Sequence, residues 1–134
     1  MSFGSGAMTN STAEIKDCKL LFLIGANPTE AHPIYGLEMK RALRRGAKLI
    51  VCDPRKTWLA QRAHIHIQHR PGSDGMLLNA MMRYILDEGL ANREFIESRC
   101  EGFEEFRENL KHYSVEAAAK YCGVDAELIR TAAR

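Results

Sequence analysis

Two short apolar runs flank a segment in which apolar residues recur every three or four positions. The runs cover residues 19–24 and 48–52, and neither alternates with polar residues. Uninterrupted apolar runs are typical of parallel strands that are covered on both faces. Two parallel strands require a crossover, so the pattern predicts a strand–helix–strand unit with its helix over residues 33–45. The predicted apolar positions of that helix are Ile34, Leu37, Met39, Ala42 and Leu43.

The remaining chain adds one strand and then only helices. Residues 64–68 alternate and predict a third strand, after which Ser73 or Asp74 begins a helix to about Glu88. The apolar stripe of this helix is Met76, Leu77, Ala80, Met81, Tyr84 and Ile85. Further helices are expected over residues 92–100, 103–113, 115–121 and 125–134, with Asn92, Ser114 and Asp125 as N-caps. The sequence predicts an α/β fold with a parallel sheet of about three strands and a helical C-terminal half.

Two shorter helical segments complete the predicted elements. One runs to about Cys18 and begins at Thr9 or Asn10, either of which suits an N-cap. The other covers residues 55–62, with Trp58, Leu59 and Ala63 as its inward side chains.

Composition narrows the class of protein further. The chain has 134 residues, 46% of them hydrophobic and 27% charged, which is ordinary for one globular domain. The net charge of +2 gives little support to nucleic-acid binding or to an anionic membrane partner. No apolar run has the length of a membrane span, and no secretory signal is visible. We therefore expect a cytoplasmic protein without membrane contact.

Several groups have the residue types of a metal or nucleic-acid site, but structural roles are favoured. The four cysteines form no CxxC pair, so we expect buried, reduced thiols at Cys18, Cys52, Cys100 and Cys122. His64 and His66 share one strand face, but no third ligand lies near them in the sequence. The basic residues 40–41 and 44–45 resemble a solvated helix face more than a nucleic-acid patch.

Polar loops follow all three predicted strands, at residues 25–32, 52–56 and 70–74. The carboxyl ends of parallel strands meet at one edge of a sheet, where α/β folds bind ligands. Gly25 would allow a phosphate to approach the backbone closely, and the start of the crossover helix and Arg55 would bind that phosphate. Asp53 is placed to accept from a ribose hydroxyl, and Asp74 is placed to accept from a base. Each residue also has a structural interpretation as turn, loop acid or cap, and the loop lacks G-x-G-x-x-G, which disfavours an ordinary NAD or FAD site.

Most of the chain resembles the molybdopterin oxidoreductase family, in particular the catalytic alpha subunits of molybdenum- or tungsten-dependent formate dehydrogenases. The similar segments are GAMTN (6–10), LLFLIGANPTEAHP (20–33), GAKLIVCDPRKT (46–57), RPGSDGMLLNAMMRYILDEGL (70–90), EFIESRCEGFEEF (94–106) and GVDAELIR (123–130). In that family the corresponding region is part of a Rossmann-like αβα domain. It binds the guanine dinucleotide end of one bis-molybdopterin cofactor.

The resemblance implies a cofactor role for all three loops. The first loop would contact the cofactor, the second would bind ribose and phosphate through Asp53 and Arg55, and the third would hold the guanine through Asp74. The residues carried over are Gly25, Ala26, Asn27, Pro28, Glu30, His32, Cys52, Asp53, Pro54, Arg55, Lys56, Gly72, Ser73 and Asp74. None of them is expected to be catalytic or to bind metal.

The family's metal centres have no counterpart in this sequence. Its iron–sulfur cysteines and its metal-ligating cysteine or selenocysteine lie upstream of the part resembled, and none of the four cysteines occupies those positions. With the narrow sheet and a helical pattern that runs to Arg134, this predicts a fragment, inactive alone, of a larger subunit that carries molybdenum or tungsten and a 4Fe-4S cluster.

We expect residues 1–134 to form a single partial domain, with residues 1–90 as the dinucleotide-binding part and 91–134 as the helical part. Its partners would be the remainder of the subunit and electron-transfer subunits. A stand-alone nucleotide-binding or protein-interaction module is the alternative. The sequence does not distinguish molybdenum from tungsten.

Overall fold

One parallel sheet lies at the centre of the molecule. The computed structural model describes residues 10–134. Strands β1 (Leu20–Ile24), β2 (Lys48–Cys52) and β3 (Ile65–Ile67) pair in parallel in the order β1-β2-β3. In this register Leu20 lies opposite Lys48, and Ile50 lies opposite Ile65. The predicted α/β class with a three-stranded parallel sheet is confirmed.

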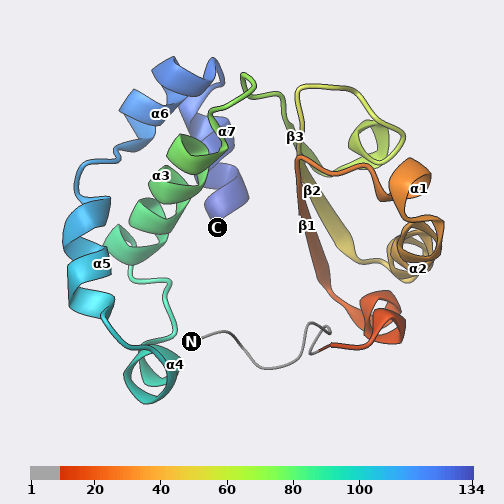
Figure 1. Ribbon diagram of the computed structural model, residues 1–134. Coiled ribbons are helices and arrows are strands. Elements are labelled where there is room, and N and C mark those ends of the chain that lie inside the picture. Colours follow the sequence, from red (N-terminus) through yellow and green to blue (C-terminus); the bar gives the residue numbers. More distant parts are fainter. Residues whose placement is uncertain (1–9) are drawn as a thin grey trace.

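One face of the sheet is covered by the segments between the strands. These are α1 (Pro28–Ala31), α2 (Pro33–Arg44) and the 3-10 turn η2 (Ala60–Arg62), together with the 3-10 helix η1 (Thr12–Asp17) that precedes β1. Helices α1 and α2 appear on the right of the sheet in Figure 1. The core on this side consists of Leu21, Leu23, Met39, Ala42, Ala47, Leu49, Val51, Leu59 and Ala60.

The opposite face packs against α3 (Asp74–Asp87), α6 (Val115–Cys122) and α7 (Ala126–Ala133), which lie together on the left of the sheet (Figure 1). Helix α3 buries Leu77, Ala80, Met81 and Tyr84, all of them in the predicted stripe. The predicted N-caps also form, because the side chain of Ser114 accepts from the Ala117 N–H and that of Asp125 from the Leu128 N–H.

Helices α4 (Arg93–Arg99) and α5 (Phe103–Leu110) extend away from the sheet, at the lower left of Figure 1. Asn92 caps α4 as predicted, by accepting from the Phe95 N–H. Leu110 is buried, whereas Phe95 and Phe106 are exposed. None of the helices between residues 10 and 134 has the length and apolar character needed to span a membrane.

The inward stripe predicted for α2 is wrong in part. Ile34 and Leu37 are 69% and 46% exposed, and the helix instead buries Gly36, Glu38, Met39 and Ala42. The cause is α1, a helical turn that the sequence did not predict. An added Cβ at Gly36 would lie 3.1 Å from the Pro28 carbonyl oxygen, so this turn of α2 packs directly against the α1 backbone.

The two short helical segments also differ from prediction. Ser11 rather than Asn10 caps η1, because its hydroxyl accepts from the Ala13 N–H, while the other candidate, Thr9, lies outside the described residues. The segment predicted as a helix over residues 55–62 is helical only at Ala60–Arg62. Leu59 is buried as expected, but Trp58 is exposed.

Candidate functional site

The three strand-end loops begin side by side at the carboxyl edge of the sheet. The Gly25 N–H donates to the Cys52 carbonyl oxygen at 2.9 Å, and the Asp53 N–H donates to the Ile67 carbonyl oxygen at 3.2 Å. An added Cβ at Gly25 would lie 4.0 Å from Asp74 Oδ1, which brings the first and third loops together. The sheet therefore places all three predicted loops around one site.

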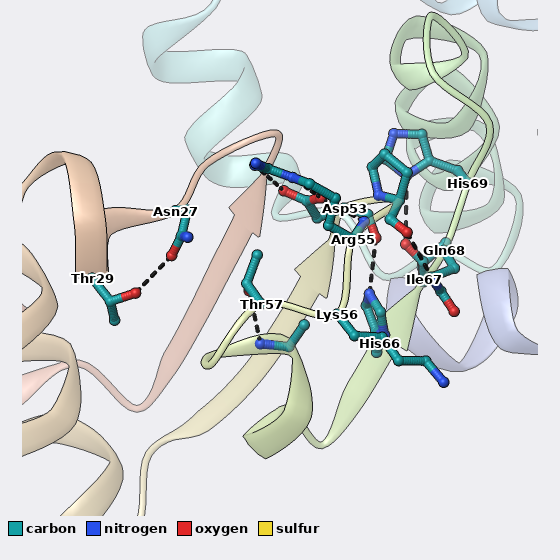
Figure 2. Close-up of polar contacts among 12 residues, drawn as sticks. Asn27, Thr29, Asp53, Arg55, Lys56, Thr57, His66, Ile67, Gln68 and His69 are labelled. Atoms are coloured by element: carbon teal, nitrogen blue, oxygen red, sulfur yellow. Dashed lines mark hydrogen bonds and ion pairs between the residues drawn. The ribbon is translucent and has the colours of Figure 1, made fainter.

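The first loop contains a helical turn rather than an open connection. Gly25 has a φ of +57°, which favours glycine, and the Thr29 hydroxyl donates to Asn27 Oδ1 at 2.6 Å (Figure 2). The sequence predicted only a loop over residues 25–32 before the crossover helix, but the helical turn α1 forms within it. This turn buries Pro28 and leaves Glu30 exposed.

The end of the same loop leads into α2 through a histidine. The His32 N–H donates to the Pro28 carbonyl oxygen at 3.1 Å and closes the turn. The His32 ring packs edge-on against Tyr35, with the ring centroids 5.8 Å apart. Ala26 is half-buried, whereas His32 is exposed at the surface.

In the second loop, Asp53 positions Arg55. The Asp53 side chain is only 2% exposed, and its Oδ1 accepts from the Arg55 backbone N–H at 2.8 Å and from Arg55 Nε at 3.3 Å (Figure 2). Burial acts to raise the pKa of Asp53, but the Arg55 backbone N–H and guanidinium, with His66, outweigh it and hold the pKa below its ordinary value. Asp53 therefore stays ionised beneath Arg55, and a ribose would reach its carboxylate only if the Arg55 side chain moved.

The second loop also carries two exposed cations, of which Arg55 contacts the buried Asp53. Arg55 and Lys56 are both exposed, as is Pro54 between Asp53 and Arg55. The backbone below them is fixed from the neighbouring strand, because His66 Nε2 donates to the Asp53 carbonyl oxygen at 2.8 Å (Figure 2). The loop thus presents positive charge on a held backbone.

The third loop joins the sheet to α3. Gly72 has a φ of +81°, and the buried Ser73 hydroxyl donates to the Arg70 carbonyl oxygen at 2.6 Å. Asp74, the first residue of α3, has a side chain that is 46% exposed, and its Oδ1 lies 3.0 Å from His69 Nε2. The His69 ring is buried, so it fixes the carboxylate from the protein interior.

Sequence reasoning missed His69. Its only signal was its place, two residues beyond the end of β3 and five before Asp74. Only the fold of the loop brings the two side chains together.

The geometry of the four cysteines supports neither redox chemistry nor metal binding. All four are free, with Cys52 and Cys122 buried as expected, but Cys18 and Cys100 are exposed, contrary to prediction. Burial, with the charge of Asp74, raises the pKa of Cys52 to about 12 and keeps it a neutral thiol. Cys52 contributes to the site through its carbonyl oxygen.

His64 and His66 both bind backbone groups of neighbouring strands or loops. His64 Nδ1 accepts from the Leu49 N–H at 3.1 Å, and His66 is engaged with Asp53. Across residues 10–134, no three His, Cys, Asp or Glu side chains come together in a way that could hold a metal ion.

Together the loops offer the groups that a nucleotide requires. Arg55 and Lys56 supply cations for phosphate, Gly25 leaves space for close backbone approach, and Asp74 presents a carboxylate. The residues present are thus chemically suited to the guanine dinucleotide that the family resemblance implies.

Comparison with known proteins gives a consistent family. Residues 2–124 match the sequence profile of the molybdopterin oxidoreductase family. The chain is 46% identical over 98% of its length to the F420-dependent formate dehydrogenase subunit alpha of Methanocaldococcus jannaschii, and 46% identical over 99% to formate dehydrogenase H of Escherichia coli. It covers 20% and 19% of those proteins, respectively.

A solved structure agrees with the sequence relatives. The acetylene hydratase of Pelobacter acetylenicus superposes with a TM-score of 0.80 at 34% identity, over 91% of this chain and 18% of that protein. The chain therefore spans about a fifth of the length of the relatives that it matches. With a profile match over nearly its whole length and the same fold in a solved relative, the chain belongs to the molybdopterin oxidoreductase family.

Proposed function

We propose that this chain is part of the catalytic alpha subunit of a molybdopterin-dependent formate dehydrogenase. Its three loops would hold the guanine dinucleotide end of a bis-molybdopterin cofactor. The observation that carries the proposal is the convergence of Gly25, Arg55 and Asp74 at one edge of the sheet. In this proposal residues 1–134 are a single partial domain, with residues 1–90 binding the dinucleotide.

Asp74 is the proposed guanine contact. His69 occupies one position on Oδ1, and the carboxylate is 46% exposed, so further acceptor positions on both oxygens face outward. Guanine presents an N–H and an amino group side by side, which a carboxylate can accept together. The buried His69 keeps Asp74 oriented before the base arrives.

Arg55 and Lys56 are the proposed phosphate contacts. Arginine binds phosphate through a planar set of donors, and Asp53 fixes the base of the Arg55 side chain. Ionised Asp53 would accept from a ribose hydroxyl after Arg55 turns toward the phosphates. The remaining loop residues would shape the site through their backbone.

The open edge of β1 supports the view that this part belongs to a larger subunit. The Lys19 carbonyl oxygen accepts from the Lys48 N–H, and the Gly25 N–H donates to the Cys52 carbonyl oxygen. Because alternate residues of a strand bond to the same neighbouring strand, the backbone groups of Leu20 and Phe22 point away from β2. No strand within residues 10–134 pairs with that edge, and both side chains are exposed. A stand-alone module would leave an apolar strand edge in water, which natural proteins avoid.

The parent subunit would oxidise formate to carbon dioxide and pass electrons to an iron–sulfur cluster and to electron-transfer subunits. When bound, the cofactor supplies the molybdenum or tungsten and the redox chemistry. This chain would bind and orient the dinucleotide end, and we expect no formate oxidation by the isolated chain. Formate is proposed as the substrate because sequence identity is 46% to two of the formate dehydrogenases, against 40% to the acetylene hydratase of Syntrophotalea acetylenica.

Substitution of Asp74 in the full-length subunit tests the proposal. We expect Asp74→Ala to lower the molybdenum or tungsten content and the pterin content of the purified enzyme in parallel, because the guanine loses its carboxylate partner. Metal analysis and pterin fluorescence after oxidation measure the two contents.

Asp87→Ala is the matched control, since Asp87 lies at the other end of α3 and pairs with Arg83 on the surface. Its cofactor content should equal that of the unmodified enzyme. Full cofactor content in Asp74→Ala would refute the guanine contact. Formate-dependent dye reduction by the isolated 134-residue chain would refute the division of roles.

A further inference from the structure

A cavity lies next to the amino ends of the strands, away from the three loops. It measures about 500 Å³, and its walls include Lys40 and Arg44 of α2, Trp58 and Arg62 of the connection between β2 and β3, and His64. His64 immediately precedes β3, whereas the candidate cofactor loops follow the strands. The cavity is thus separate from the proposed dinucleotide site.

Trp58 holds two of the cations in this cavity. The guanidinium carbon of Arg62 lies 3.8 Å from the indole centroid, and Lys40 Nζ lies 4.6 Å from it. Arg62 Nη1 also donates to the Trp58 carbonyl oxygen at 3.2 Å. Cation–π contact restrains both side chains near one aromatic ring, so their charges are positioned in advance of any ligand.

The basic residues of α2 divide into two sets. Arg41 pairs with Glu38 and Arg45 pairs with Asp17, so these cations are neutralised on the molecule itself. Lys40 and Arg44 instead line the cavity. Among residues 10–134, no carboxylate forms a salt bridge with Lys40, Arg44 or Arg62.

His64 adds a donor to these charges. The Leu49 N–H donates to His64 Nδ1 at 3.1 Å, so that nitrogen accepts and the neutral ring carries its hydrogen on Nε2. No Asp or Glu lines the cavity. Its charged and titratable side chains therefore all present hydrogen-bond donors, which suits an anion and disfavours a cation.

We propose that this cavity binds the phosphate groups of a small polyphosphate-bearing molecule. A volume of about 500 Å³ is within the range of small-molecule sites. Arginine and lysine together bind phosphate through several charge-assisted hydrogen bonds. Lys40 and Arg62 already contact the indole ring of Trp58. The ring therefore positions these charges, and the ligand is recognised through its anionic groups. The proposal is independent of the proposed dinucleotide site.

Fluorescence of Trp58 provides the test, because it is the only tryptophan in the chain. Tripolyphosphate is titrated into the 134-residue protein at constant ionic strength, with inorganic phosphate and sodium chloride in parallel. We expect saturable binding of tripolyphosphate, weaker binding of phosphate and no saturable change with chloride. Arg44→Gln should weaken tripolyphosphate binding about tenfold, since it removes charge-assisted bonds to the ligand.

Arg41→Gln is the matched control on the same helix, because Arg41 is already paired with Glu38. Its affinity should stay within about twofold of the unmodified protein. Equal weakening by both variants would show diffuse attraction to α2 and overturn the site, as would a signal that never saturates. Tighter binding of an oligoglutamate peptide than of tripolyphosphate would overturn the proposed ligand class. Calorimetric titration of the same variants checks that the optical signal reports binding.

Discussion

Helices α2 and α3 both cover the sheet, but α3 buries more of the stripe that its sequence predicts than α2 does. Leu77, Ala80, Met81 and Tyr84 of α3 are buried against the sheet and against α6 and α7. In α2 the predicted apolar residues Ile34 and Leu37 remain exposed. The α1 turn packs against α2 at Gly36, so the buried face of α2 depends on a contact with another segment as well as on its own apolar pattern.

Helix α3 packs its apolar stripe against the sheet and against α6 and α7, whereas part of the apolar surface of α2 remains exposed. On its sheet-facing side α2 packs on η1 and on the core of β1 and β2, and α1 contacts it at Gly36. The exposed apolar residues of α2 fit the proposal that this helix contacts the remainder of a longer subunit, because this chain spans about a fifth of the length of its relatives. In that proposal the apolar residues that α2 exposes in this chain are covered in the longer subunit.

Truncating one leucine on each helix gives the largest expected difference. Leu77→Ala should lower the free energy of unfolding of the 134-residue chain by about 2–5 kcal/mol, because it opens a cavity at a fully buried position. Leu37→Ala should change it by less than about 0.5 kcal/mol, since Leu37 is exposed in this chain. Urea unfolding followed by circular dichroism measures both changes. Equal destabilisation by the two variants would remove the distinction between the helices.

A pair of glycine substitutions tests the contact that displaced the predicted α2 stripe. Gly36→Ala should destabilise the chain by about 1–3 kcal/mol, because its Cβ would lie 3.1 Å from the Pro28 carbonyl oxygen. Gly75→Ala in α3 is the control, since a Cβ there has no atom within 4 Å. Alanine at that helical position should be neutral or stabilise by about 0.5–1 kcal/mol. Thermal unfolding of both variants decides whether α1 is packed as tightly as described.

The sequence predicted what depends on local patterns and missed what depends on contacts between loops. The strands, α3 and the caps Asn92, Ser114 and Asp125 follow from apolar spacing and from side chains that bond their own helix. The three loops could be placed at one edge because parallel strands share a direction. A contact such as that of His69 with Asp74 depends on the conformation of the loop between them, which the sequence pattern does not give.

The candidate site shows the same division. Asp53 and Arg55 could be named from the sequence, but their mutual arrangement could not. An acid after a strand is equally suited to a ligand or to its own loop, and the distances show that Asp53 binds the backbone and side chain of Arg55. The turn α1 was missed because residues 25–32 have no apolar periodicity, and Pro28 begins a helix there by contact with α2.

The smallest expected effect concerns the second loop, which follows β2 and contains Asp53 and Arg55. The pKa of Asp53 is lowered in the folded state, so at moderately acidic pH the unfolded chain binds a proton that the folded chain does not. The stabilisation from ionised Asp53 is therefore complete above the unfolded pKa of about 3.9 and is lost as pH falls through the lower folded value. The Arg55 contacts are worth about 1 kcal/mol.

Asp53→Asn separates this charge effect from the loop geometry, because an asparagine oxygen can still accept from the Arg55 N–H. Near neutral pH the variant should be less stable than the unmodified chain by about 1 kcal/mol, and the gap should close as pH falls below the folded pKa of Asp53. Asp87→Asn, on the exposed end of α3, should show a smaller gap near neutral pH. A gap for Asp53→Asn that stays constant to low pH would mean that packing, and not charge, holds this loop. Urea unfolding across the acid range measures this gap. A constant gap would mean that apolar packing stabilises the second loop, as it stabilises α3 on the other face.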